Sequence, residues 1–185
     1  ISFGSQSLVQ DMVVGLTLLF SDAMDVDDTV EIAGTVVVVG RVQEIGLRFT
    51  KIVNLYNQIV FIPNRTIANV SRFPDGGVYT YADVQIPDDA DRDKVTVTIK
   101  SVVESVQNQF AAIIFESALV EMTSPPDGKK SSFVRVRFKI WPGQGALIET
   151  TFRQRMLRAM RTFDSNYAEW QVPVFYRALQ SGISD

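Results

Sequence analysis

The chain has 185 residues, of which 46% are hydrophobic and 21% are charged. This composition is typical of a folded protein with one large or two small domains, and it argues against disorder. A formal net charge of −3 gives no general attraction to nucleic acid or to anionic lipid. Cysteine and histidine are both absent. Their absence excludes disulfides, thiolate nucleophiles, the usual zinc ligands and the side chain that most easily carries protons near neutral pH.

Residues 3–21 predict a helix, because apolar residues recur there at intervals of three and four. These residues are Val9, Val13, Leu16 and Phe20, with Leu8, Met12 and Leu19 beside them. Small and polar residues line another face: Gly4, Ser7, Asp11 and Gly15. In water each interior glycine costs about 1 kcal/mol against alanine, whereas in a membrane small residues let helices approach closely. Composition alone favours an amphipathic helix packed on its own domain, with a helix of a membrane protein as the alternative.

No membrane-spanning segment is predicted within the sequence. The longest uncharged apolar stretch, Met12–Phe20, is too short to span a bilayer, and no secretory signal is visible. Because the chain begins at Ile1 rather than at a methionine, we expect a fragment of a longer protein.

An acidic segment at residues 22–31 leads into a strand predicted for Thr29–Ile32. Its aspartates are Asp22, Asp25, Asp27 and Asp28. A calcium site and a solvated acidic rim both fit such a cluster, but the EF-hand spacing and its closing glutamate are missing, which favours the rim. Asp27 is expected to accept positive φ, because aspartate is one of the few residues that tolerate it. Residues 36–39 are predicted as a buried strand that ends at Gly40, where the chain must turn or bulge.

The segment Gly40–Asn64 is predicted to form two strands joined by a polar turn. Apolar residues alternate with polar ones in the first strand: Leu47, Phe49 and Ile52. Residues 59–62 have no polar break, which is typical of a strand covered on both faces. Pro63 lacks a backbone donor and is expected to end that strand. Asn57 is expected in the turn, since it tolerates a left-handed backbone.

Residues 67–72 are predicted to leave the sheet, and the Pro- and Gly-rich residues 73–77 predict a linker between two domains. Beyond the linker, the pattern predicts the element order β-α-β-β-α-β of a ferredoxin-like fold. The expected strands are 78–86, 117–123, 133–141 and 171–175. One expected helix begins after Asp89 or Asp91, and the other spans residues 146–163. The first of these helices is expected to bury Val95, Ile99, Val102, Val106 and Phe110. The second is expected to turn Ile148, Phe152, Met156, Ala159 and Phe163 inward. In the strands, the apolar faces are expected to consist of Ala82, Val84 and Ile86, and of Val134, Val136, Phe138 and Ile140.

No enzymatic motif is present, because the sequence holds no Gly-x-Ser-x-Gly elbow, no Walker A motif and no paired-glycine dinucleotide fingerprint. We therefore expect no enzyme, no catalytic residue, no cofactor and no metal site. The basic residues concentrate on the last helix, at Arg153, Arg155, Arg158 and Arg161. An RNA-binding face and a solvated helix side are both consistent with them, and the lack of an accompanying aromatic platform favours the solvated side.

The central segment also carries an ordered set of residues: Gly40, Val42, Ile45, Arg48, Thr50 and Ile52, followed by Ile62, Pro63 and Asn64. This set resembles the β domain of the small-conductance mechanosensitive channel (MscS) family. The resemblance implies an α+β protein with an N-terminal amphipathic pore helix, a small Sm-like β-barrel and a ferredoxin-like domain. The implied boundaries are 1–22 for the C-terminal half of the pore-lining helix, 23–73 for the β domain and 74–185 for the α/β domain.

The N-terminal residues resemble the end of the family's pore-lining helix. The resemblance implies that Phe3 lies near a hydrophobic constriction and that Gly4 and Asp11 belong to the pore-exit segment. Gly15 matches a glycine at which the family helix can flex, and Ser7 stands where some members have another glycine. In the β domain, the motif residues implied by the resemblance are Gly40, Arg48, Thr50, Pro63 and Asn64.

The function that the resemblance implies is that of a mechanosensitive ion channel, which opens under membrane tension and releases ions and small solutes during hypo-osmotic shock. The implied partners are further copies of the same chain in a homoheptamer, the lipid bilayer, and the permeating ions and solutes, but no nucleic acid. The implied location is the inner (plasma) membrane of a bacterial or archaeal cell, with this portion mostly cytoplasmic. The alternative is a soluble oligomeric module that binds RNA or a small effector.

Overall fold

The computed structural model describes residues 3–123 and 132–175, and the side chains of residues 5–117 and 132–175. The chain divides into two compact units, Ile1–Gly77 and Val78–Asp185. Each unit combines helix with an antiparallel sheet. The predicted α+β class is therefore confirmed.

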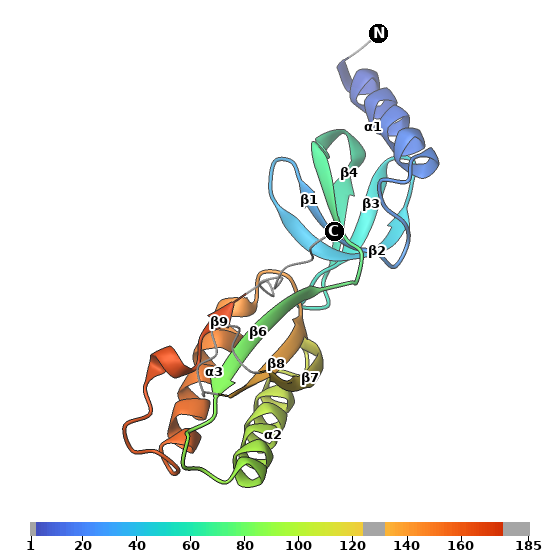
Figure 1. Cartoon of the computed structure of the whole chain (residues 1–185). Helices are drawn as coiled ribbons and strands as arrows, with labels where there is room; N and C mark the ends of the chain where they lie inside the picture. The colour runs from blue at the N-terminus through green and yellow to red at the C-terminus, as the bar shows by residue number, and fades with distance from the viewer. Residues whose placement is uncertain (1–2, 124–131, 176–185) are drawn as a thin grey trace. The chain divides into compact units, whose positions relative to one another are not determined.

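The first unit contains one long helix and a five-stranded antiparallel sheet (Figure 1). Its elements are α1 (Phe3–Phe20), β1 (Thr29–Ala33), β2 (Val38–Ile45), β3 (Phe49–Val53), β4 (Ile59–Pro63), the 3-10 helix η1 (Asn64–Thr66) and β5 (Asn69–Phe73). The strands lie in the order β4-β3-β2-β1-β5, so that β4 and β5 form the two edges of the sheet. Helix α1 packs against η1, β2 and β3.

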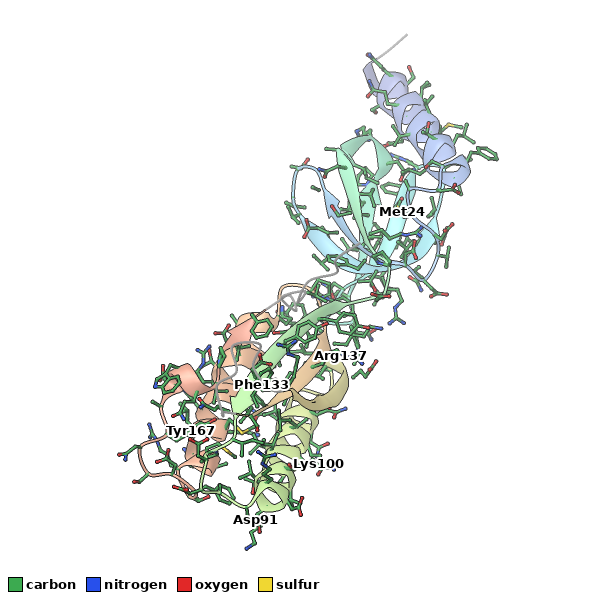
Figure 2. All side chains as sticks on the ribbon, in the orientation of Figure 1. Met24, Asp91, Lys100, Phe133, Arg137 and Tyr167 are labelled. Carbon is green, nitrogen blue, oxygen red and sulfur yellow. The ribbon has the colours of Figure 1, made fainter. Side chains whose placement is uncertain are left out.

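Alternation along the strands places one set of side chains in the core of the first unit. The buried apolar residues are Leu18, Met24, Val30, Ile32, Val42, Ile52 and Ile62. Met24 lies in the segment between α1 and β1, and its side chain is only 1% exposed (Figure 2). Full burial of a methionine side chain contributes about 1.5–3 kcal/mol, so this connecting segment is anchored to the sheet.

Two turn residues adopt the left-handed backbone that their side chains predict, Asp27 with φ 73° and Asn57 with φ 59°. The N–H of Asp27 donates to the carbonyl oxygen of Val42 at 2.8 Å, and the N–H of Val42 donates to the carbonyl oxygen of Asp28 at 2.8 Å. The turn after α1 is thereby joined to β2. The helix predicted at residues 3–21 and the predictions for these two turn residues are confirmed.

The prediction of a single strand ahead of the polar turn is wrong. The chain turns between β2 and β3, where the N–H of Gly46 donates to the carbonyl oxygen of Phe49 at 2.9 Å. Because β3 begins only at Phe49, the phase of its alternation places Thr50 and Ile52 in the core. Leu47, which the sequence placed in the strand, lies in the turn and is exposed.

The buried strand predicted at residues 36–39 is also wrong. Val36 and Val37 are 68% and 65% exposed between β1 and β2, because a run of identical apolar residues gives no phase from which burial could be assigned. Gly40 does not end a strand either. It pairs with Val30 inside β2, and the register shifts only further along that strand.

Two further predictions fail at the edges of the sheet. β4 is an edge strand whose Ile59 and Phe61 are exposed, so it is not covered on both faces. Residues 67–72 do not leave the sheet, because β5 begins at Asn69 and pairs with β1. A short apolar run is common to buried strands and to edge strands, and the sequence alone could not separate them. Pro63 does end β4, as predicted.

The second unit has the element order β-α-β-β-α-β that the sequence predicts (Figure 1). Its elements are β6 (Val78–Gln85), α2 (Arg92–Gln109), β7 (Ile114–Thr123), β8 (Phe133–Ile140), α3 (Gly145–Met160), the 3-10 helix η2 (Glu169–Gln171) and β9 (Val174–Phe175). The strands lie in the order β7-β8-β6-β9, and each pair is antiparallel. The first helix of this unit begins after Asp91 rather than Asp89, since the Asp91 carboxylate accepts from the N–H groups of Asp93 and Lys94.

Alternate residues of this sheet and one face of each helix form a single apolar core. Many of the predicted inward residues lie in it: Ala82, Val84, Ile86, Val95, Ile99, Val106, Val134, Val136, Phe138, Ile140, Ile148, Phe152 and Met156. Val103, which was not predicted, is buried, whereas Val102 only packs against the edge of the core. The buried Tyr167 joins the segment between α3 and η2 to β6, because its hydroxyl donates to the carbonyl oxygen of Gln85 at 2.7 Å (Figure 2). Burial raises the pKa of the Tyr167 hydroxyl well above its ordinary value.

Candidate functional site

Helix α1 carries a carboxylate that is completely buried against the sheet. Asp11 is 0% exposed, and its Oδ1 accepts from the backbone N–H of Arg65 at 2.9 Å. Its Oδ2 accepts from Nη1 of Arg65 at 2.7 Å, and Nε of Arg48 lies 3.9 Å from the same oxygen. A buried charge is stable only when it is paired and hydrogen-bonded. The position of α1 on the first unit therefore depends on an ion pair between a helix residue and a residue of η1.

Asn64 organises the sheet side of this contact. Its Oδ1 accepts from Oγ1 of Thr50 at 2.9 Å, and its Nδ2 donates to the carbonyl oxygens of Gly46 and Leu47 at 2.9 and 3.0 Å. The N–H of Asn64 donates to the carbonyl oxygen of Arg48 at 3.0 Å. One buried amide thus fixes both the turn between β2 and β3 and the start of η1. The same amide nitrogen lies 3.5 Å from the carbonyl oxygen of α1 at Asp11, a longer contact.

Gly15 lies one helical turn beyond Asp11, where the backbone of α1 comes close to the turn between β2 and β3. A Cβ added to Gly15 would lie 2.3 Å from the carbonyl oxygen of Leu47 and 2.5 Å from Nδ2 of Asn64. Helix α1 runs without interruption through this position. We call Asp11, Gly15, Thr50, Asn64 and Arg65 the polar junction.

Much of the remaining α1 surface is apolar and uncovered. The exposed large apolar residues of α1 are Leu8, Val9, Met12, Val13, Leu16, Leu19 and Phe20. The helix is thus fastened through its small and polar face, and the apolar stripe that the sequence pattern picks out points away from its own unit. Contiguous exposed apolar surface of this kind marks a site of contact with lipid or protein. In the part of the chain that the structure describes, no helix has the length and apolar character needed to cross a bilayer.

The structure brings together predicted site residues from two distant parts of the sequence: Asp11 and Gly15 of α1 with Arg48, Thr50 and Asn64. Pro63 ends β4 and directly precedes Asn64. Ser7 is half-buried on α1. Phe3 and Gly4 lie in the first turn of α1, but their side-chain positions fall outside the described residues. Gly40 lies at the opposite end of the β2–β3 ladder, where an added Cβ would come within 2.8 Å of the carbonyl oxygen of Val53.

Arg65 is the residue of the polar junction that the sequence analysis missed. A signal was present, because Asp11 is the sole charged residue of α1. A lone carboxylate on the helix face of small residues requires a cation on the surface that it meets. Arg65 directly follows Pro63 and Asn64, and it is the basic residue nearest to them in the sequence.

Other charged groups of the sequence analysis serve as local partners. Nη1 of Arg72 lies 3.6 Å from Asp25 and 3.3 Å from Asp28, so part of the acidic cluster is neutralised by β5. Within the described residues, no three potential ligands are grouped as a metal site would require. On α3, Arg153 pairs with Glu149 at 2.6 Å.

The second unit does carry aromatic rings on its sheet, but cations lie over several of them. Arg137 lies 5.3 Å from the ring centroid of Tyr79, and Arg135 lies 5.4 Å from that of Phe175. Arg135 is itself held by Asp83, with hydrogen bonds of 2.7 and 2.8 Å. These bonds raise the pKa of the Arg135 guanidinium. Rings and charges on this face are therefore partnered within the chain.

A family model described as "Mechanosensitive ion channel, beta-domain" matches residues 7–72. The match includes every residue of the polar junction. Residues 7–72 belong to the mechanosensitive ion channel β-domain family. The resemblance predicted from the central segment is confirmed.

A curated relative extends the similarity to nearly the whole chain. The small-conductance mechanosensitive channel of Caldanaerobacter subterraneus subsp. tengcongensis is 30% identical over 173 residues. The alignment covers 94% of this chain and 58% of the relative. This chain therefore spans little more than half the length of the curated channel that it matches.

Two solved structures that resemble this chain have lower sequence identity to it. The closed-state crystal structure of Helicobacter pylori MscS is 17% identical, with a TM-score of 0.42, and the match covers 97% of this chain and 67% of that chain. The cryo-EM structure of Arabidopsis thaliana MSL1 is 16% identical, with a TM-score of 0.40, and covers 87% of this chain and 58% of that chain. The family assignment rests on the sequence matches.

Proposed function

We propose that this chain is the pore-exit helix and the cytoplasmic part of a mechanosensitive channel, which opens under membrane tension and releases ions and small solutes during hypo-osmotic shock. In this proposal α1 is the C-terminal half of the pore-lining helix (residues 1–22). Residues 23–73 form an Sm-like collar, and residues 74–185 form a ferredoxin-like domain. The protein resides in the inner (plasma) membrane of a bacterial or archaeal cell.

The observation that carries the proposal is the way α1 is held. A helix with an uncovered apolar surface is fastened by a buried carboxylate to a unit of the mechanosensitive channel β-domain family. A soluble protein would gain stability by turning this apolar surface toward its own sheet. The opposite orientation supports a helix whose apolar surface is covered by other subunits or by lipid.

Membrane tension acts on such a channel as a ligand acts on a protein with two states. Tension favours the open state because that state has the larger in-plane area, and it shifts the population only by the difference in work between the two states. A shift from 1:99 to 99:1 requires a difference of about 5.5 kcal/mol. The polar junction is the link through which movement of α1 is passed to the collar.

The sheet edges support assembly with further copies of the chain, which we propose to be a homoheptamer. In the described residues, β4 and β5 each pair on one side only. An unpaired edge is a template for a strand of another chain. Beside β4 lies a cavity of about 290 Å³, lined by Val36, Val60 and Phe61 among others. The strand orders of the two sheets are consistent with the Sm-like and ferredoxin-like arrangements that the resemblance implies.

Patch-clamp recording of the full-length protein in liposomes under graded suction tests the proposal. We expect tension-dependent openings with weak selectivity among small ions. Silent patches from liposomes that demonstrably contain the protein would refute the channel function. The upstream reading frame gives an independent check, because the proposal requires apolar segments of spanning length before Ile1.

The constriction is tested by Phe3→Ser in the full-length protein. The substitution replaces an apolar side chain at the proposed constriction by a polar one, so we expect the channel to open at lower tension. Leu8→Ser, on the exposed face of the same helix, is the matched variant for a general loss of apolar surface. Equal thresholds in Phe3→Ser and wild type would remove Phe3 from the constriction.

A further inference from the structure

Gly15 is the residue of α1 at which the family resemblance implies bending, yet the structure gives its missing side chain another role. We propose that Gly15 is a contact glycine that seats α1 on the turn between β2 and β3. Residues 11–18 of α1 then move with the five-stranded sheet as one body. This inference deepens the proposed function, since it says which part of the exit helix can bend, but its test does not require channel activity.

The first argument is steric. A Cβ at Gly15 would lie 2.3 Å from the carbonyl oxygen of Leu47, 2.7 Å from the carbonyl carbon of the same residue and 2.5 Å from Nδ2 of Asn64. Real Cβ atoms do not approach heavy atoms this closely, so either α1 or the turn would have to move. Rotation of the Leu47 carbonyl away from α1 would break the hydrogen bond that it accepts from Nδ2 of Asn64. The amide of Asn64 is equally fixed, because Thr50, Gly46 and Leu47 hold it.

The second argument comes from the residues that flank Gly15 on α1. One turn earlier, Asp11 is 0% exposed and is bonded to Arg65 through both its carboxylate oxygens. Almost one turn later, Leu18 is buried in the core of the first unit. Residues three and four apart lie on one face of a helix, so Asp11, Gly15 and Leu18 form one continuous stripe on the sheet. A bend at Gly15 would pull at least one flanking residue out of its site.

A glycine inside a helix can provide flexibility or allow close contact, and its replacement by alanine has a different effect in each case. If Gly15 is kept for flexibility, alanine removes only backbone freedom and makes the helix more stable. If Gly15 is kept for contact, alanine forces α1 away from the turn and weakens the polar junction. The two uses therefore predict changes of opposite sign. Any bending of α1 then lies ahead of Asp11, on the side of Gly4 and Ser7.

Hydrogen exchange measured by mass spectrometry on the full-length protein tests this proposal. In Gly15→Ala we expect amides of peptides covering residues 11–20 and 46–66 to exchange at least tenfold faster than in wild type, because both sides of the contact are loosened. Thr17→Ala is the matched control, since Thr17 is exposed on the same helix and its hydroxyl bonds only to the carbonyl oxygen of Val13 among its described contacts. It should leave exchange at residues 46–66 unchanged.

Slower or unchanged exchange in Gly15→Ala would overturn the proposal and would assign flexibility to Gly15. Wild-type protein provides a second test if the variant does not fold. A contact glycine requires amides on both sides of Gly15 to exchange as slowly as those of β2 and β3, whereas a hinge requires local fast exchange there. A failed patch-clamp experiment would count against the channel function alone, because none of these outcomes depends on channel opening.

Discussion

The two units of this chain hold their helices in opposite ways. In the second unit, α2 and α3 turn apolar faces toward the sheet and share one core with it, in which Phe138 and Phe152 meet edge to face at 5.3 Å between ring centroids. In the first unit, α1 turns its small and polar face toward the sheet, buries Leu18 beside it, and leaves most of its large apolar residues uncovered. Hydrophobic contact between a helix and a sheet is non-directional. An ion pair and a close backbone contact, in contrast, fix the helix in one position. The comparison suggests that α1 is held for its position and that α2 and α3 are held for stability.

The largest expected effect is the loss of an aromatic ring from the second unit. Phe152→Ala should destabilise that unit by about 3–5 kcal/mol, because it removes buried apolar surface and leaves a cavity. Both tryptophans lie in this unit, so their fluorescence during urea unfolding reports it selectively. Leu147→Ala, exposed on the same helix, should change stability by less than about 0.5 kcal/mol. Equal losses of stability in the two variants would contradict the shared apolar core as the main source of stability in this unit.

The next effect is the loss of the cation that pairs with the buried carboxylate of α1. Arg65→Ala should destabilise the attachment of α1 by about 2–3 kcal/mol, since it leaves Asp11 buried and without its main partner. Arg48→Ala is the matched variant, because its guanidinium is 3.9 Å from Asp11 and its side chain is 57% exposed. It should cost no more than about 1 kcal/mol. Exchange of α1 amides measures both, and equal losses would show that Arg65 has no special role.

A smaller effect is expected from the hydrogen bond beneath the polar junction. Thr50→Val keeps the shape of the side chain but leaves Oδ1 of Asn64 without its donor, which should cost about 1–2 kcal/mol. Thr50→Ser retains the hydroxyl and should lose less. Exchange of the amides at residues 46–48 is the measurement, since Asn64 holds that turn. A Ser variant that is less stable than the Val variant would show that packing of the methyl group matters more than the hydrogen bond.

The smallest effect concerns the start of α2. The hydrogen bond from the backbone N–H of Lys94, with that of Asp93, lowers the pKa of Asp91 from its ordinary value of 3.8. Because the pKa is lower in the folded state, the carboxylate stabilises the fold fully above its ordinary pKa, and this contribution is lost as the pH falls through the folded value. The melting temperature of Asp91→Ala should therefore lie slightly below that of wild type at pH 6, and the two should converge toward pH 2. A constant difference over this range would show that the carboxylate charge is not responsible.

Sequence reasoning succeeded where one physical signal determined the structure. In the second unit, the period of Val134 to Ile140 and that of Ile148 to Met156 identified the inward faces, because burial of apolar area dominates there. Asp27 and Asn57 were found because few residues accept positive φ. In the strands of the first unit the apolar pattern failed, since four successive valines carry no phase and an edge strand resembles a buried one.

The polar junction was only half predictable. The residues of the central motif and those of α1 were each singled out, but nothing in their spacing indicated that they meet. Their contact joins residues more than fifty positions apart, as Asn64 and Arg65 are from Asp11. Burial of Asp11 depends on a cation from a different element, and the sequence pattern of α1 reports only that one face is small and polar. Asp11 meets Asn64 and Arg65 only because the fold of the first unit places η1 against α1.

The turn that follows α1 has a mechanical consequence. Its residues Asp27 and Asp28 are hydrogen-bonded to Val42 of β2, and the other attachment of the helix, at Gly15, meets the turn that ends β2. Both ends of the attachment therefore deliver load to the same inner strand, which has neighbours on each side. A pull on α1 would therefore reach β2 at both of its ends, and through Asp11 and Arg65 it would also reach η1 at the end of β4.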